Sequence, residues 1–252
     1  MYDEYYQSPN PSLKSNSQVD VKSSSFLSRV YGYMFIGIII TAIVAFGAGF
    51  GFQTWFSSDT SEAAYMTYLW TLIGSFIGLF IVSFIVNIVA LRGRHSIAIP
   101  AVIYSVLMGI VFSEFVLFVP YWILGTAFVI TSMVFAIMFF IARVTKRNLN
   151  WMGTLGFGLL MGALIMSIFF FFLYFVFPAY FSWLYVIIDG VIFVAMILIT
   201  MFDVWRIQKI ADKGAESKNL ALYCAFSLYV DFMYILMRVI FILLRLFGSS
   251  RN

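Results

Sequence analysis

The sequence predicts an all-α integral membrane protein, a bundle of seven transmembrane helices. Hydrophobic residues make up 63% of the 252 residues and charged residues only 10%, whereas an ordinary soluble domain has about 25% charged residues. The mean hydropathy is +1.00. A soluble fold cannot cover this much apolar surface with its own polar exterior. Seven apolar segments each exceed the ~20 residues needed to cross a ~30 Å hydrocarbon core.

The predicted spans divide the chain into a tail, a membrane domain and a short end. They lie at about 30–52, 67–91, 97–118, 121–142, 153–177, 182–205 and 219–247. Residues 1–28 are polar and rich in Ser and Asn, so we expect a flexible cytoplasmic tail. They contain no short apolar stretch that leads to a cleavage site, as a signal peptide would. Residues 29–248 form the predicted seven-helix domain, and 249–252 a short C-terminal tail.

The basic residues predict the orientation in the membrane. Those between spans or before the first span are Lys14, Lys22, Arg29, Arg92, Arg94, Arg143, Lys146, Arg147, Arg206, Lys209, Lys213 and Lys218. The alternate connections, around 53–66, 119–120 and 178–181, contain none. Because cytoplasmic loops carry excess Lys and Arg, this pattern places the N-terminus in the cytoplasm. It also explains the net charge of +4 without a nucleic-acid partner.

The C-terminus is less clearly placed. An odd number of spans puts it outside, but Arg245 and Arg251 near that end argue against this. A last helix that crosses only part of the membrane therefore stays open as an alternative. We expect the host to be a bacterial cytoplasmic membrane, because the loops are short and no targeting signal is recognised.

A few ionisable residues fall inside the predicted spans. They are Glu114, Asp189, Asp203, Asp231, Arg238 and Arg245. A charge at mid-bilayer costs ~2.5–3.5 kcal/mol even on the mildest scale, so each needs a partner, a cavity or a change of protonation state. We expect Glu114 and Asp189 to be hydrated near the outer ends of their spans.

Asp203 and Asp231 lie on the last two spans, which a short loop joins as antiparallel neighbours. If their depths match, the two carboxyl groups meet and share one proton. Such a dyad predicts a pH-sensitive gate or a transient cation site, since carboxylate oxygens suit calcium. The alternative is that each aspartate pairs with an arginine and braces the bundle. The residues alone favour neither.

The charges of the last span follow a heptad. Asp231, Arg238 and Arg245 are spaced by seven and therefore share one helix face. Seven residues cover ~10 Å, too far for a direct bond between Asp231 and Arg238. We therefore expect Asp231, Arg238 and Arg245 to find partners on other helices, with Glu114 one candidate for Arg238.

Glycines four apart occur in three spans, where they allow close helix packing. The pairs are Gly47 and Gly51, Gly74 and Gly78, and Gly158 and Gly162. We expect packing within the monomer, with homodimerisation as the alternative.

Three segments resemble the transmembrane Bax inhibitor motif family. They are TKRNLNWMG at 145–153, ILITMFDVWRIQKI at 197–210, and ALYCAFSLYVDFMYI with the later LLRLFG near the C-terminus. The resemblance covers nearly the whole chain from about Phe26. Three features depart from the family pattern. Phe202 replaces the usual Tyr before Asp203, and the segment between Asp231 and Arg245 is about one helical turn longer. The second span also has no equivalent of an acidic residue found in some bacterial relatives.

The resemblance implies a seven-helix bundle with the last helix central. It implies that Asp203 and Asp231 form a pH-sensing dyad and that a basic residue at the end of the second span is their partner, Arg92 or alternatively Arg94. Family members are described as pH-dependent calcium leak channels and as suppressors of stress-induced death, and some bacterial members modulate a membrane protease. Arg238, inside the longer segment, is expected either to raise a barrier to calcium or to pair with an acid such as Glu114.

Enzymatic functions are not expected. A rhomboid-type serine protease needs a His within the membrane, but the single His95 lies between spans. A zinc membrane protease needs an HExxH motif, which the sequence lacks. A retinal protein needs a lysine for its Schiff base, and no predicted span contains one. Neither Asp189 nor Asp231 has the Gly-x-Gly-Asp context of an intramembrane protease. Two hypotheses remain, without a cofactor: a cation leak that passes calcium or protons, or a non-conducting regulator that binds a membrane protein such as a protease or stress-response factor.

Overall fold

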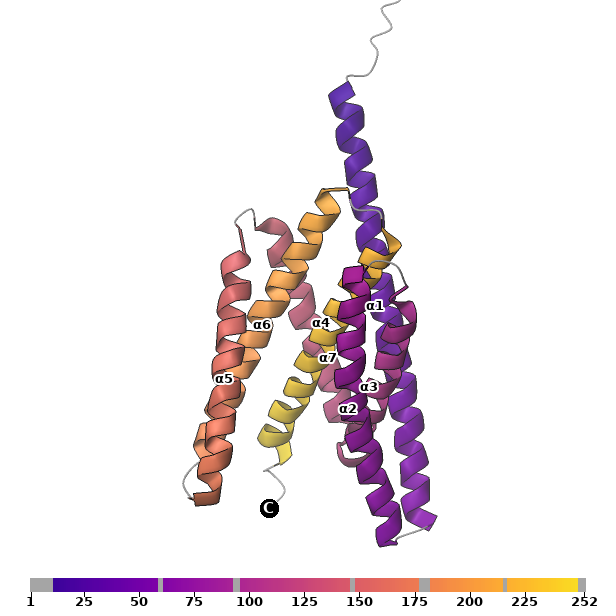
Figure 1. Cartoon of the computed structure of the whole chain (residues 1–252), viewed down its shortest axis with the longest axis vertical. Helices are drawn as coiled ribbons and strands as arrows, with labels where there is room; N and C mark the ends of the chain where they lie inside the picture. The colour runs from indigo at the N-terminus through magenta and orange to yellow at the C-terminus, as the bar shows by residue number, and fades with distance from the viewer. Residues whose placement is uncertain are drawn as a thin grey trace, which may run out of the picture.

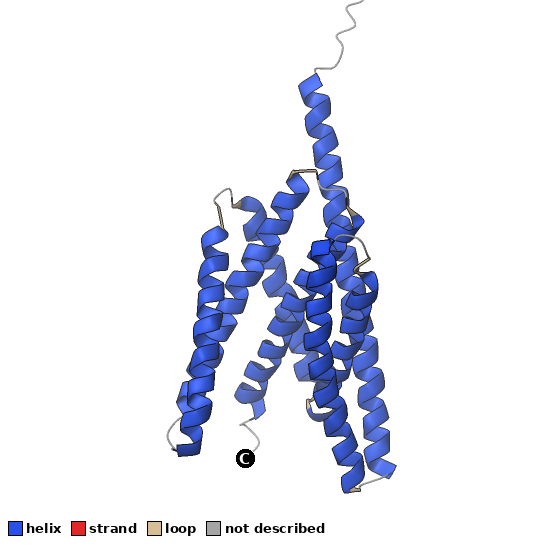
Figure 2. Cartoon of the chain, viewed as in Figure 1, coloured by secondary structure: helices blue, strands red, loops and turns tan. Residues whose placement is uncertain are grey.

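The computed structural model describes residues 11–58, 61–92, 96–145, 148–176, 182–214 and 217–248. In these residues every regular element is an α-helix (Figures 1 and 2). The helices are α1 (Pro11–Ser58), α2 (Glu62–Arg92), α3 (Ala98–Phe118), α4 (Tyr121–Val144), α5 (Asn150–Val176), α6 (Ser182–Asp212) and α7 (Lys218–Gly248).

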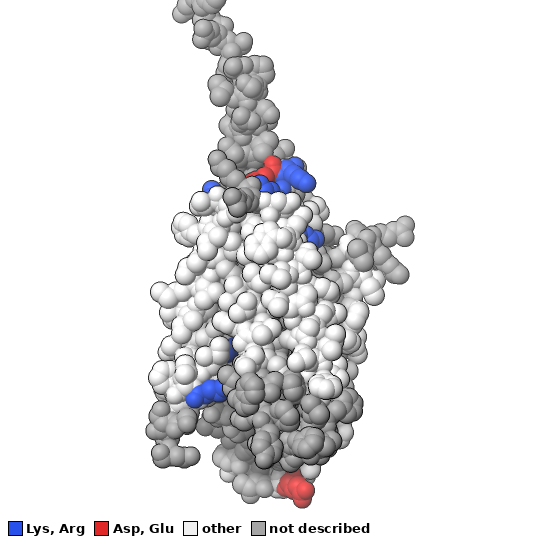
Figure 3. Space-filling model, turned by 90° about the vertical axis from the view of Figure 1, so that its left-hand side faces the viewer, with Lys and Arg blue, Asp and Glu red and all other residues white. Residues whose placement is uncertain are grey.

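Six of these helices, α1 to α6, are long and apolar enough to cross a membrane. On the face shown in Figure 3, the described charged side chains gather towards the ends of the molecule, and a wide band between them has few charges. This band has the character of a surface that faces lipid hydrocarbon. The prediction of an all-α membrane protein is therefore confirmed.

Helix α7 packs against several neighbours at once, as α1 and α6 also do. It contacts α1, α4 and α6 and, to a smaller extent, α2. Figure 1 shows it between the α5–α6 pair and the group of α1, α2 and α3. Leu228 and Ile235 are both 0% exposed, and Ile240 is 1% exposed. One face of α7 therefore belongs to the core.

Helix α5 packs mainly on α6, and two glycines allow the close approach. A Cβ atom at Gly153 would lie 2.7 Å from the ring of Phe202, and one at Gly156 would lie 3.1 Å from the carbonyl oxygen of Ala195. Away from the α6–α7 loop, the two helices stand apart from the rest of the bundle (Figure 1). There Ala163 and Ile188 are buried in a small cluster separate from the main core.

The segment predicted as a flexible tail is partly helical, because α1 begins at Pro11. Proline suits the first turn of a helix, where its missing N–H costs no hydrogen bond. Phe26 is fully buried, and the Ser23 hydroxyl lies 3.5 Å from a carboxylate oxygen of Asp212 on α6. These contacts stabilise the part of α1 from Ser23 onward, which precedes the predicted span.

The predicted packing of the glycine pairs is wrong for five of the six glycines. Among the described residues, an added Cβ would meet nothing within 4 Å at Gly47, Gly51, Gly74, Gly158 and Gly162. The contact between α1 and α3 instead depends on Gly109. There an added Cβ would lie 2.6 Å from the Val44 Cβ and 2.9 Å from the carbonyl oxygen of Thr41.

The variant Gly109→Ala is therefore expected to lose about 1–3 kcal/mol of stability, because the backbone of α1 must move to admit the methyl group. Gly162→Ala is the control: its methyl meets open space, and alanine favours a helix over glycine. Detergent-titrated unfolding of both purified variants measures the difference. Equal midpoints for the two would contradict the close contact at Gly109.

Candidate functional site

The α6–α7 hairpin brings the functional candidates together. Gly214 follows α6 with a φ of +75°, a left-handed conformation that glycine adopts without strain at a helix C-terminus. The turn reverses the chain, and α7 begins at Lys218. The second half of α6 therefore lies along the first half of α7.

Asp203 contacts α7 directly. Its Oδ2 accepts a hydrogen bond from the Ser227 hydroxyl at 2.6 Å. A small hollow beside this bond is lined by Arg206, Tyr223 and Cys224. The bond from a neutral hydroxyl to a carboxylate joins the two helices at this level.

Asp231 lies one helical turn after Ser227, on the same face of α7. It is 9% exposed, and its Oδ2 is buried without a hydrogen-bond partner in the part of the chain that the structure describes. A buried oxygen in this state carries an uncompensated desolvation cost. The two aspartates thus flank the same α6–α7 contact, although their carboxyl groups make no hydrogen bond to each other in the residues that the structure describes.

Neither aspartate forms an ion pair with a described lysine or arginine side chain. The two residues predicted as their basic partners cannot be placed: Arg94 and the side chain of Arg92 lie outside the described part of the chain. Helix α2 does reach α7 nearby, because the Tyr223 hydroxyl donates a hydrogen bond to Asn87 Oδ1 at 3.2 Å.

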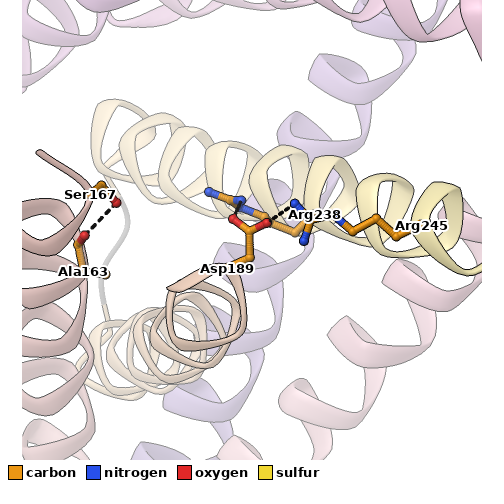
Figure 4. Close-up of polar contacts among 5 residues, drawn as sticks. All are labelled: Ala163, Ser167, Asp189, Arg238 and Arg245. Carbon is orange, nitrogen blue, oxygen red and sulfur yellow. Dashed lines mark hydrogen bonds and ion pairs between the residues drawn. The ribbon is translucent and has the colours of Figure 1, made fainter. Parts of the chain in front are cut away.

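At the other end of the α6–α7 contact, one carboxylate binds two guanidinium groups (Figure 4). Arg238 Nη1 lies 2.8 Å from Asp189 Oδ1, and Arg245 Nη2 pairs with Asp189 Oδ2. The side chains of Arg238 and Asp189 are 27% and 26% exposed, and that of Arg245 is 51% exposed. The heptad prediction that both arginines find partners on another helix is confirmed.

The partner of Arg238 is Asp189 and not Glu114. Glu114 is exposed on α3, whereas Asp189 is on α6, which packs against α7. Hydropathy places both acids near the ends of their spans but carries no information on which way each helix is rotated. Asp189 is therefore a paired residue rather than a solely hydrated one.

A third polar group, which the sequence did not reveal, joins α1, α3 and α7. The hydroxyl groups of Thr41 and Tyr229 lie 2.6 Å apart, and the Thr41 hydroxyl also lies 3.1 Å from the carbonyl oxygen of Ser105. Thr41 and Tyr229 are each 2% exposed. Isolated Thr and Tyr residues in apolar spans give no pattern from which this cluster could be found.

The described residues do not contain a group of three or more His, Cys, Asp or Glu side chains that could hold a metal ion. Calcium takes six to eight oxygen ligands in proteins. Asp203 and Asp231 alone supply fewer oxygen atoms than such a site needs.

Comparison with known proteins agrees with this architecture. A family model described as "Inhibitor of apoptosis-promoting Bax1" matches residues 23–252. The chain belongs to this Bax inhibitor family.

Bacterial relatives of the family cover most of the chain. The inner membrane protein YbhL of Escherichia coli K12 is 27% identical over 239 residues, which are 90% of this chain and 92% of YbhL. YrjE of Lactococcus lactis is 29% identical over 238 residues, with the same coverage. No solved structure matches. The chain is thus a multi-pass membrane protein of this family.

Proposed function

We propose that this protein is a pH-sensitive cation leak of a bacterial cytoplasmic membrane, with calcium as a permeant ion and no enzymatic activity. The observation that carries the proposal is the buried Oδ2 of Asp231, which has no hydrogen-bond partner among the described residues and lies one turn from the Ser227–Asp203 bond. A buried carboxyl group of this kind is costly to ionise in a membrane protein and is typical of a proton-linked site.

We further propose that all seven helices cross the membrane, with the N-terminus in the cytoplasm and α7 in the centre. The buried face of α7 and its contacts with α1, α4 and α6 support the central position. The basic loops support the orientation. In this arrangement Asp203 and Asp231 lie in the cytoplasmic half, and the Asp189 cluster lies in the outer half.

In the proposed mechanism, Asp203 and Asp231 gain and lose protons, and the packing of α6 against α7 changes with their charge. When Asp231 is neutral, the helices pack closely around it. When both carboxylates are ionised, they repel each other and attract a cation or a nearby arginine, for which Arg92 and Arg94 are the candidates. Calcium then meets carboxylate oxygens briefly on its way through.

Ion flux into proteoliposomes tests the proposal. Purified protein is expected to pass calcium at a rate that changes between pH 5 and pH 8. Asp203→Asn and Asp231→Asn each remove one ionisable carboxyl group, so both variants are expected to flatten the pH profile, while Glu62→Gln, an exposed acid at the start of α2, keeps it. Absence of flux at every pH, or unchanged profiles in both aspartate variants, would refute the leak.

The alternative is a non-conducting regulator that binds another membrane protein. One observation favours it: α5 packs mainly on α6 and leaves large apolar side chains such as Phe157, Ile165 and Phe169 exposed. In this case the aspartates control the shape of the surface that the partner binds. A crosslinked pull-down from native membranes would recover that partner, and a pull-down that recovers none would count against the regulator.

A further inference from the structure

Helix α6 changes partners along its length. From Phe193 onward its residues join the main core, in which Met201, Val204 and Ile207 are buried. Of the side chains before Phe193 that the structure describes, from Ile187 on, none joins it: Ile188, Val191 and Ile192 form the small separate cluster with Ala163 of α5. In this described region, the outer part of the α5–α6 pair therefore packs on itself and not on the main core.

The Asp189 cluster lies in this outer part. Its two ion pairs join α6 to α7 in a region where the two helices share no described core cluster. Each oxygen of the carboxylate binds a different arginine, and Figure 4 shows the two guanidinium groups converging on Asp189 from α7. Arg238 and Arg245 are two turns apart on one face, which is why a single carboxylate can reach both.

We infer that Asp189, Arg238 and Arg245 form an ionic latch that holds the outer part of the α5–α6 pair against α7. Charge-assisted hydrogen bonds are strong enough to keep two helices together. Because the three side chains remain partly exposed and lie outside the described core clusters, these bonds can break without opening the main core. A hydrophobic seam in the same place would lack this reversibility.

The latch lies on the same α6–α7 contact as the two aspartates, at its opposite end. Arg238 follows Asp231 by seven residues, or ~10 Å along α7. This step rests on the proposed function: if cations move along this contact, the closed latch blocks its outer end and adds a net positive charge there. Opening the latch removes the block, so the two ends of the contact are controlled by different residues.

Distances between spin labels in nanodiscs test the latch directly. One label replaces Ile165 on α5 and the other Leu246 on α7, which are 65% and 63% exposed. Cys224, the buried free cysteine, is changed to Ser in this background. Labels at Ile43 on α1 and Phe118 on α3, also exposed, form a reference pair across the α1–α3 contact.

Asp189→Asn is expected to shift the α5–α7 distances to longer values and to raise the open fraction at least roughly tenfold, because the neutral amide weakens both ion pairs. Asp189→Glu keeps the charge and is expected to keep the short distance. Glu114→Gln is the matched control, an exposed acid of α3. The reference pair is expected to stay unchanged in every variant.

The same variants in the flux assay separate the two proposals. A longer distance with faster calcium flux in Asp189→Asn supports the latch as a gate. A longer distance without flux of any ion in any variant supports the latch and refutes the leak. An unchanged distance in Asp189→Asn overturns the latch, whatever the flux.

Discussion

Asp231→Val is expected to raise the thermal stability of the protein while it abolishes the pH dependence of ion flux. The wild-type Oδ2 is buried and makes no hydrogen bond to any described residue. Replacing an unpaired buried polar group with an apolar side chain of similar size removes its desolvation cost, which is typically about 1–3 kcal/mol. Functional residues commonly destabilise a fold in this way. Thermal unfolding in detergent, followed by tryptophan fluorescence, measures the gain.

Asp203→Val is the matched control, and its expected effect on stability has the opposite sign. Asp203 accepts the 2.6 Å hydrogen bond from Ser227, so its loss leaves that hydroxyl without its partner at the helix contact. Both variants lose a carboxyl group, and both are expected to lose pH sensitivity. If Asp231→Val is less stable than the wild type by as much as Asp203→Val, then Asp231 stabilises the fold. It is then not a functional residue that lowers stability.

Hydropathy predicted the helices well, because lipid leaves the chain few alternatives to a helix. It did not predict where α1 begins. The polar segment before Phe26 continues the helix, and Ser23 contacts Asp212, which lies 189 residues later in the chain. Hydropathy in a local window contains no term for such a long-range contact.

The charged residues were predictable in kind but not in pairing. The heptad spacing of Arg238 and Arg245 correctly required partners on another helix. Choosing Asp189 over Glu114 needs the rotation of α3 and α6, which is set by packing details such as the fit of Phe202 against Gly153. For Asp203 and Asp231, the antiparallel arrangement followed from the short loop, but the intervening role of Ser227 depends on the exact register of the two helices.

Glycine spacing was a weak guide because it also carries no information on how each helix is rotated towards its neighbours. A pair of glycines four apart makes one helix face flat, but the sequence does not say whether that face meets a neighbour. Gly153 and Gly156 meet α6 although they are three apart, whereas Gly158 and Gly162 on the same helix meet open space. Which face is used depends on the partner helix as much as on the glycines.

Leu228→Ala is expected to destabilise the protein by about 2–4 kcal/mol. Leu228 is 0% exposed on α7, so the truncation leaves a cavity in the core, and costs of this size are typical of buried leucines. Because lipid tails are as apolar as leucine, the loss comes from packing contacts and not from exposure to water. Leu246→Ala, at a position 63% exposed on the same helix, is the control and is expected to change stability by less than about 0.5 kcal/mol.

The comparison between these two leucines also tests the position of α7. A central helix is surrounded by protein, so truncation anywhere on its buried face should cost more than truncation at its exposed end. Ile235→Ala, two turns after Leu228 and also 0% exposed, is expected to match Leu228→Ala in detergent-titrated unfolding. If Leu228→Ala and Ile235→Ala were as mild as Leu246→Ala, lipid could fill the space they leave. Helix α7 would then lie at the edge of the bundle. A pathway between α6 and α7 would be exposed to lipid and would not be enclosed by protein across the membrane.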